Sequence, residues 1–144
     1  MPDDNCLFCR IVSGELPATI VYEDEVSVAF LDHRPLFPGH TLLVPREHVE
    51  TLGELPTAIV EPYFKAAQLL ARAVETGLDA EGTFVAMNNR VSQSVPHLHV
   101  HVVPRRRKDG LKGFFWPRTK YKGEDEMKFV QSKIAAALKK VRQK

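Results

Sequence analysis

The chain has 144 residues, and its apolar content of 44% is sufficient for one soluble domain with a hydrophobic core. No apolar run is long enough to span a membrane and the polar residues 1–5 do not form a signal peptide, so we expect a cytoplasmic protein without a membrane partner. The net charge of +2 is divided unevenly: residues 1–104 carry 6 Lys and Arg against 14 Asp and Glu, whereas residues 105–144 carry 14 against 4. The basic part can attract an anionic partner, but a helix with solvated lysines also explains most of its charge.

The first half of the chain is predicted to begin with a short helical turn over residues 7–12. Apolar and β-branched residues between turn residues then predict three strands, over residues 19–22, 26–31 and 40–44. The first two strands form a hairpin, and Pro45 ends the third. The clearest helix follows over residues 57–76, because its apolar positions keep helical spacing. Those positions are Ile59, Tyr63, Ala66, Ala67, Leu70 and Val74.

The second half is predicted to contain two more strands, over residues 83–87 and 96–103, and a final helix from about residue 124 to 141. Acidic residues in the first turn of this helix and lysines in its last turn complement the helix dipole. The order of elements predicts an α+β fold with a mainly antiparallel sheet of about five strands, one long helix and a C-terminal helix. We expect a single domain over residues 1–144.

Three histidines occupy every second position of the last predicted strand: His97, His99 and His101. Alternate residues of a strand share a face, so these imidazoles are expected in one row, while Leu98 and Val100 pack into the core on the other face. An imidazole can be a nucleophile, a proton donor or a metal ligand near neutral pH. A row of three favours a functional site over a structural role.

The only two cysteines form a Cys-x-x-Cys pair, Cys6 and Cys9. A thioredoxin-like redox site would need a βαβ context, which is not predicted here. The other interpretation is half of a tetrahedral zinc site that two histidines complete. His48 and one member of the histidine row are available for that purpose.

These motifs resemble the histidine triad (HIT) superfamily of nucleotide hydrolases and transferases. Residues 97–103 match its motif, His-x-His-x-His followed by two apolar residues, and Gln93-Ser94 stands just ahead. Blocks at residues 6–12, 22–24, 29–32 and 38–48 match the family pattern in order, so the likeness covers about residues 5–105. The resemblance implies a HIT-like fold with a basic aromatic extension over residues 105–144, and a two-fold homodimer through the long helix and the sheet edge.

The resemblance also implies a catalytic mechanism. His99 would attack the α-phosphorus of a nucleotide and form a covalent nucleotidyl-histidine, which water then hydrolyses. His101 would donate to a phosphate oxygen or to the departing atom, and His40 would support the triad from a neighbouring strand. Gln93 and Ser94 would supply neutral donors to the phosphate.

Nucleotide-binding and metal-binding residues follow from the same resemblance. Asp32 would hold the ribose hydroxyls, and Asn88, with Asn89 as the alternative, would lie beside the phosphate. The residues that match the family's purine slot are Phe8, Ile11, Phe30 and His33. The zinc ligands would be Cys6, Cys9, His48 and His97. This closed set of four leaves no position for water, so the zinc would be structural.

Two segments depart from the family pattern or extend beyond it. Relatives usually carry a glycine-rich loop where this chain has residues 87–93 without glycine, so Arg90 either replaces the lost backbone donors or is solvated. Residues 105–118 are basic and include Phe114, Phe115 and Trp116. They would either cradle a polyphosphate and stack a second base, or be buried in a dimer contact.

The favoured function is therefore hydrolysis at the α-phosphate of a purine nucleotide conjugate. The Cys-x-x-Cys block favours a nucleoside phosphoramidate as the substrate, whereas the basic aromatic segment favours a dinucleoside polyphosphate. One alternative is a nucleotide sensor or scaffold whose slow catalysis is incidental. Another is nucleic-acid-end processing, but binding to nucleic acid at physiological salt is not expected because residues 1–104 are acidic.

Overall fold

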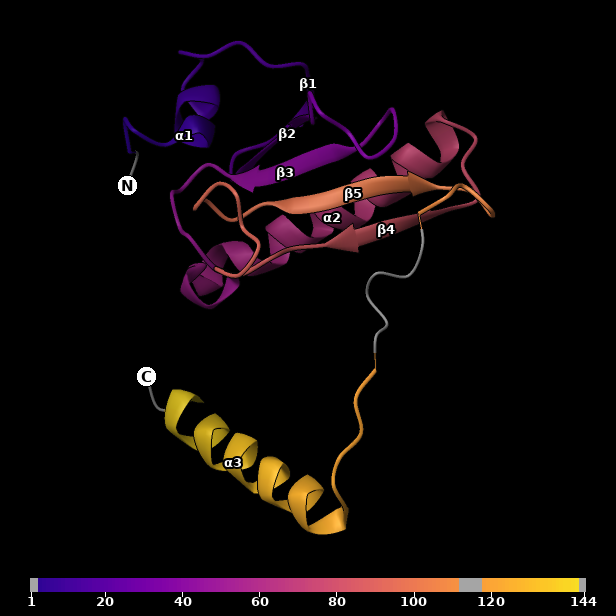
Figure 1. Ribbon diagram of the computed structural model, residues 1–144. Helices are drawn as coiled ribbons and strands as arrows, with labels where there is room; N and C mark the ends of the chain where they lie inside the picture. The colour runs from indigo at the N-terminus through magenta and orange to yellow at the C-terminus, as the bar shows by residue number, and fades with distance from the viewer. Residues whose placement is uncertain (1–2, 112–117, 143–144) are drawn as a thin grey trace. The chain divides into compact units, whose positions relative to one another are not determined.

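The computed structural model describes residues 3–111 and 118–142 (Figure 1). Five strands form one antiparallel sheet in the order β1-β2-β3-β5-β4. Their bounds are β1 Ile20–Glu23, β2 Ser27–Leu31, β3 Thr41–Pro45, β4 Gly82–Ala86 and β5 Val100–Arg105. The helices are α1 Leu7–Val12, α2 Thr57–Gly77 and α3 Glu124–Arg142, with a 3₁₀ turn, η1, at Leu52–Glu54. The predicted α+β fold with an antiparallel five-stranded sheet is confirmed.

The chain divides into two compact units, a sheet unit over residues 1–109 and a C-terminal unit over residues 110–144 that contains α3. Each unit is described by itself. Among the described helices, none combines the length and the apolar character that crossing a membrane requires.

The long helix α2 covers one face of the sheet (Figure 1). Its buried positions are five of the six predicted from the spacing of apolar residues, namely Tyr63, Ala66, Ala67, Leu70 and Val74. They pack against Ala29, Leu43, Leu98, Val100 and Val102. The Tyr63 hydroxyl donates to the carbonyl of Leu43 at 2.8 Å, which satisfies the one polar group of that ring inside the core.

The opposite face of the sheet carries the short helix α1. Phe8 of α1 packs with Val28 and Phe30 of β2 and with Leu42 and Val44 of β3. These residues alternate with the α2-facing residues because side chains of a strand point to opposite faces. The register pairs Leu42 with His101 of β5. The imidazole of His101 therefore lies on the α1 side of the sheet.

The prediction of a strand over residues 96–103 was wrong at its start, because β5 begins at Val100. The His97 amide donates to the carbonyl of Val95 at 2.8 Å, and the Leu98 amide donates to the carbonyl of Val49 at 2.7 Å. These bonds hold the chain in a turn before it joins the ladder. The histidine row is consequently divided: His97 enters a cluster with the cysteines, and His99 lies beside His101.

Candidate functional site

His99 is buried just ahead of β5, and one of its ring nitrogens has a fixed role. Its Nδ1 lies 2.8 Å from the carbonyl oxygen of His97. A carbonyl oxygen only accepts, so Nδ1 carries the proton and Nε2 keeps its lone pair. A neutral imidazole with a free Nε2 is the form that can act as a nucleophile.

His40 and His101 form a hydrogen-bonded pair whose tautomers are fixed in the same way. The Leu36 amide donates to His40 Nδ1 at 3.1 Å, so the proton of His40 is on Nε2. His40 Nε2 lies 2.9 Å from His101 Nδ1, which must accept. The proton of neutral His101 is therefore on Nε2. The Nε2–H of His101 is thus a donor, and the centroid of the His101 ring lies 4.9 Å from that of His99.

The surroundings keep this pair uncharged. Burial, together with the neighbouring His99 and His40, lowers the pKa of His101 to about 4. Burial also lowers the pKa of His40, and the Asp32 carboxylate, 3.8 Å from His40 Nε2, opposes that shift. Both rings are neutral near pH 7, in agreement with the tautomers that their hydrogen bonds impose.

A cavity of about 610 Å³ opens beside these histidines. Eight of the predicted site residues line it, namely Phe8, Ile11, Phe30, Asp32, His33, Ser94, His99 and His101. The Phe8 ring meets Phe30 and His99 edge to face, with centroid distances of 5.4 and 5.1 Å. The wall is completed by residues that sequence reasoning missed, namely Leu7, Leu16, Pro17, Ala18, Thr19, Leu31, Leu42 and Val95. An apolar pocket with a few polar groups at one end is suited to a nucleoside.

Asn88 and Gln93 are engaged outside this cavity. Asn88 Nδ2 donates to the carbonyl of Ser92 at 3.1 Å. The amide of Gln93 is used at both ends, because Oε1 accepts from the Arg90 amide at 2.8 Å and Nε2 donates to the carbonyl of Glu50 at 2.8 Å. The Asn89 side chain also serves the loop and accepts from the Leu52 amide at 2.7 Å. In this structure, the side-chain amides of Asn88, Asn89 and Gln93 hold the loop that leads to Ser94.

The glycine-free loop is held in a conformation that favours glycine. Arg90 and Ser92 have φ values of +73° and +61°. The Arg90 guanidinium lies 3.9 Å from the carboxylates of both Glu50 and Glu54. The charge of Arg90 is thus directed toward η1 and the segment before it.

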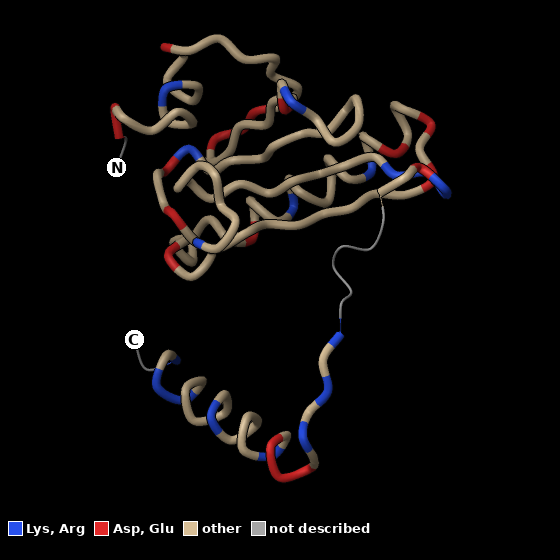
Figure 2. Tube along the Cα trace, viewed as in Figure 1, with Lys and Arg blue, Asp and Glu red and all other residues tan. Residues whose placement is uncertain are grey.

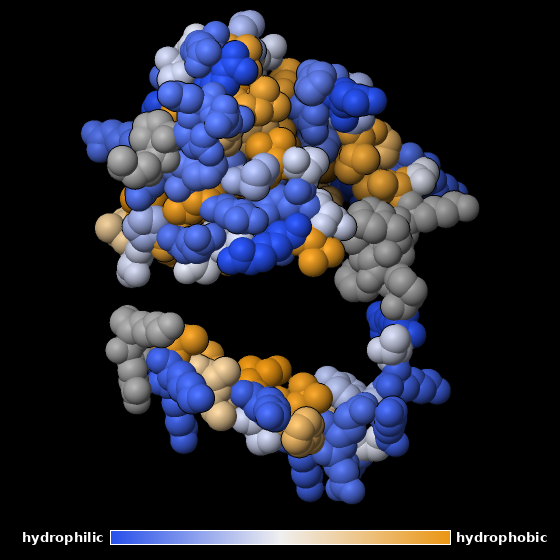
Figure 3. All heavy atoms as spheres, turned by 60° about the vertical axis from the view of Figure 1, so that its left-hand side comes forward, coloured by the Kyte–Doolittle hydropathy of each residue, from blue (hydrophilic) through white to orange (hydrophobic). Residues whose placement is uncertain are grey.

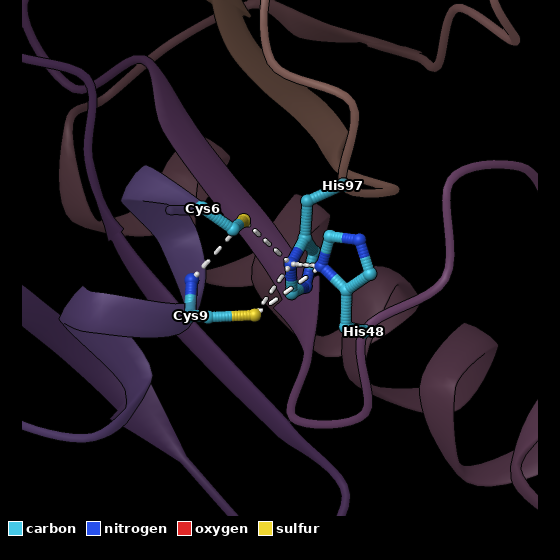
Figure 4. Close-up of side chains that lie close together, drawn as sticks. All are labelled: Cys6, Cys9, His48 and His97. Atoms are coloured by element: carbon cyan, nitrogen blue, oxygen red, sulfur yellow. Dashed lines mark hydrogen bonds between the residues drawn. The ribbon is translucent and has the colours of Figure 1, made fainter. Parts of the chain in front are cut away.

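Cys6, Cys9, His48 and His97 form a tight cluster (Figure 4). Four of the distances between possible ligand atoms are 3.2–3.5 Å: Cys6 Sγ to His97 Nδ1 3.3 Å, Cys9 Sγ to His48 Nδ1 3.2 Å, Cys9 Sγ to His97 Nδ1 3.5 Å and His48 Nδ1 to His97 Nδ1 3.2 Å. Tetrahedral bonds of about 2.0–2.3 Å place neighbouring ligand atoms about 3.3–3.8 Å apart. The cluster therefore has nearly the dimensions of a tetrahedral zinc site.

The local structure aims these ligand atoms at one point. Cys6 is the N-cap of α1, and its Sγ accepts from the Cys9 amide at 3.4 Å, which brings both sulfurs to the same side of the helix. His97 Nε2 donates to the carbonyl of Pro45 at 2.9 Å, so the lone pair of Nδ1 faces the cysteines. Burial raises the pKa of the Cys9 thiol, so a pair of thiolates here would require a neighbouring cation.

The basic segment is described only in part, since Phe114, Phe115 and Trp116 lie outside the described residues. Within the sheet unit, Arg105 forms an ion pair with Asp109 at 2.6 Å, and Arg107 pairs with Glu81. These two cations are already matched by carboxylates.

Comparisons with known proteins agree with the fold and with the cluster. The model of the HIT domain family matches residues 13–108. The solved structure of a HIT family protein from Bacillus subtilis is 37% identical, with a TM-score of 0.84 over 92% of this chain and 96% of that one. A zinc-bound histidine triad family protein from Mycobacterium smegmatis is 38% identical, with a TM-score of 0.71 over 92% and 95%. Adenosine 5'-monophosphoramidase hnt1 of Schizosaccharomyces pombe is 31% identical over 137 residues, which are 94% of this chain and 99% of that protein.

Proposed function

The chain belongs to the HIT domain family, and we propose that it is a hydrolase that cleaves the α-phosphate bond of a purine nucleotide conjugate. The observation that carries this proposal is the pair of tautomers at His99 and His101, which sets a free nucleophilic nitrogen beside a fixed donor at one cavity. The similarity to a monophosphoramidase supports a nucleoside phosphoramidate as one substrate. A dinucleoside polyphosphate is the other substrate class that the same chemistry serves.

The reaction would proceed in two displacements at phosphorus. His99 Nε2 attacks the α-phosphorus, and the bond to the leaving group breaks with its electron pair on the leaving atom. His101 Nε2–H donates a hydrogen bond to a phosphate oxygen or to that atom. Water then attacks the phosphorus, the P–N bond to His99 breaks, and a nucleoside monophosphate departs. The leaving group takes up one proton from solvent, and the attacking water returns one proton to solvent, so the two displacements balance.

Binding would use the residues around the cavity. Asp32 accepts hydrogen bonds from the two ribose hydroxyls, and Ser94 donates to the phosphate. The purine would lie between Phe8, Ile11 and Phe30, where apolar side chains hold a base without forming hydrogen bonds to its edge. Asn88 and Gln93 would reach the phosphate only by exchanging their present hydrogen bonds within the loop.

Release of AMP from adenosine phosphoramidate tests this proposal. The wild type is expected to turn the substrate over, and His99→Ala is expected to lose about 10⁴-fold of that rate because the nucleophile is absent. A diadenosine polyphosphate assayed in parallel distinguishes the two substrate classes. Equal turnover by wild type and by folded His99→Ala would overturn the assignment of His99.

We further propose that Cys6, Cys9, His48 and His97 hold a structural zinc ion. The fit of the cluster to tetrahedral geometry and the zinc-bound relative support this assignment. When bound, the ion supplies a cross-link between α1 and the segment that precedes β5. His97 then serves as a ligand, and its carbonyl orients the nucleophilic ring of His99.

We also propose a two-fold homodimer through α2 and β4. The strand β4 is at the edge of the sheet, where unpaired backbone groups favour pairing with another strand. Val85 of β4 and Phe64 and Leu69 of α2 are exposed apolar residues of these elements. Sedimentation equilibrium is expected to give twice the mass of the chain, and a monomer would contradict the proposal.

A further inference from the structure

The C-terminal helix α3 has an apolar stripe that no described residue of its own unit buries. Among the described residues of α3, none is buried, although the helix is 19 residues long. The exposed fractions of its larger aliphatic side chains are 50% for Met127, 59% for Ile134, 47% for Leu138 and 59% for Val141. Figure 3 shows apolar side chains gathered along one side of this helix. Most of the stability of a helix in a protein comes from packing of its apolar face, so this exposed face is a surface for a partner.

The stripe consists of Met127, Val130, Ile134, Leu138 and Val141, and its spacing identifies the partner. The steps between these positions are three, four, four and three residues, so the pattern reads the same in both directions from Ile134. Two such helices in antiparallel orientation therefore match position by position: Met127 meets Val141, Val130 meets Leu138, and Ile134 meets its own copy. A self-complementary surface of this kind is what a two-fold axis requires.

The charges of α3 select the antiparallel arrangement. The first turn carries Glu124, Asp125 and Glu126, and the last turn carries Lys139, Lys140 and Arg142 (Figure 2). A parallel pair would set acidic turn against acidic turn and basic turn against basic turn. An antiparallel pair sets each acidic turn against the basic turn of the other helix, with Glu126 on the same flank of the interface as Lys140 of the second copy.

The surface beside the stripe has room for these partner side chains. A groove of about 440 Å³ runs along the first half of α3, where Tyr121 stands beside Met127, Val130 and Ile134. In the antiparallel arrangement, the partner's Leu138 and Val141 are the side chains opposite this half of the helix. Aliphatic knobs entering such a groove bury apolar area on both helices.

We propose that α3 pairs antiparallel with α3 of a second copy of this chain, about a two-fold axis at Ile134. The residues of this interface are different from those of the proposed catalytic site, and the proposal does not depend on the hydrolase activity. It joins the two C-terminal units, whichever surfaces of the sheet units also meet.

Cross-linking between labelled copies tests the proposal directly. Full-length chains with a photoreactive phenylalanine at position 127 are prepared with ¹⁴N and with ¹⁵N, mixed in urea and refolded together, so that dimers of mixed label form. We expect cross-linked peptides that join position 127 of one label to the region of Val141 of the other. Cross-links between two copies of position 127 would indicate a parallel pair, and cross-links confined to one label would indicate an intramolecular partner; either result overturns the proposal.

Two sets of variants test the stripe and the charges. Ile134→Asp places two carboxylates at the axis and should lower the yield of mixed-label cross-links at least tenfold, whereas Ala136→Asp, on the opposite side of the helix, should leave it unchanged. Glu126→Lys and Lys140→Glu should each lower the yield, and the double variant should restore it. Equal yields in the two Asp variants would contradict the interface, as would binding of wild-type protein to anionic vesicles with no mixed-label cross-link.

Discussion

His101 depends on a single neighbour for the form in which it acts. Its Nδ1 accepts from His40 Nε2, and among the described residues this bond keeps the ring proton on Nε2, the nitrogen proposed to donate to the phosphate. His40 is in turn held by the Leu36 amide. The proposed donor to the phosphate is thus oriented by a chain of hydrogen bonds that begins in the backbone before β3.

Replacement of His40 by alanine tests this dependence. His40→Ala is expected to lower kcat by about 10- to 100-fold, because His101 then distributes its proton between both nitrogens, while KM changes little. Steady-state kinetics with the phosphoramidate substrate measure both values. Loss of binding without loss of kcat would mean that His40 contacts the nucleotide instead of positioning His101.

The lowered pKa of His101 also predicts a pH dependence of stability. The unfolded chain protonates this ring near 6.5, whereas the folded chain does so only near 4. Between these values the unfolded state binds more protons, so the free energy of unfolding falls as the pH is lowered from 6.5 toward 4. Urea unfolding at pH 7 and pH 5 should show a smaller decrease in His101→Gln than in wild type. An identical decrease would exclude His101 as a source of the effect.

At the residue scale, the sequence predicted half of the residues that line the cavity and did not predict how the loop before Ser94 is held. His99, His101, Asp32 and Phe8 could be assigned because their motifs have a characteristic order and spacing. The hydrogen bonds of Gln93 could not be predicted, because its partner Glu50 is distant in sequence. A side-chain amide can also donate equally well to a backbone carbonyl or to a phosphate. The residues from Leu16 to Thr19 carry no motif, and only the folded chain brings them to the cavity.

Among the elements, α1 is short for a helix that anchors a site. It has six residues, and its buried residues are Phe8 and Cys9. Two of the proposed zinc ligands lie at its start, and the other two belong to distant segments. The metal would therefore supply the cross-link that so small a helix cannot provide through apolar packing alone.

Replacement of a cysteine ligand tests the role of the metal at α1. Cys9→Ser should lower the affinity for zinc by more than about 100-fold and lower the urea midpoint of unfolding. Atomic emission should find one zinc per chain in wild type and less in the variant. Ser13→Ala, at the other end of α1, is the matched control and should retain the metal. Full zinc content in Cys9→Ser would exclude this ligand set.

In the loop between β4 and β5, a substitution is expected to stabilise the protein, whereas Cys9→Ser is expected to destabilise it. Ser92→Gly relieves a left-handed conformation and should raise the free energy of unfolding by up to about 1 kcal/mol. Ser13→Gly is the control, because Ser13 has an ordinary φ of −76° and should gain nothing. Urea unfolding measures both. Destabilisation by Ser92→Gly equal to that of Ser13→Gly would contradict the predicted relief.

The spacing of apolar residues predicted the type of every long element, because burial of one face makes apolar residues recur with a fixed period in a helix or a strand. It predicted α2 almost to the residue and missed the start of β5. The amides of His97 and Leu98 bond to Val95 and Val49 instead of the neighbouring strand, and apolar alternation continues through such a turn. The 3₁₀ turn η1 was also missed, since three residues are too few to show a period.

For the whole molecule, the division of charge in the sequence corresponds to the two units. The sheet unit carries 10 Lys and Arg against 15 Asp and Glu, and the C-terminal unit carries 10 against 3. The sequence predicted α3 and its basic last turn, but the partner of a helix is decided by surfaces that composition does not specify. The symmetric spacing of the α3 stripe supports our proposal that its partner is a second copy.

The central claim is that His99 carries the nucleotide between the two displacements. Intact-protein mass spectrometry during turnover of adenosine phosphoramidate, after quenching in alkaline denaturant, tests it most directly. We expect a fraction of wild-type chains heavier by one adenylyl group, with the adduct mapped to His99 and absent from His99→Ala. Turnover with no adduct under rapid quenching, or an adduct that persists in His99→Ala, would contradict the account.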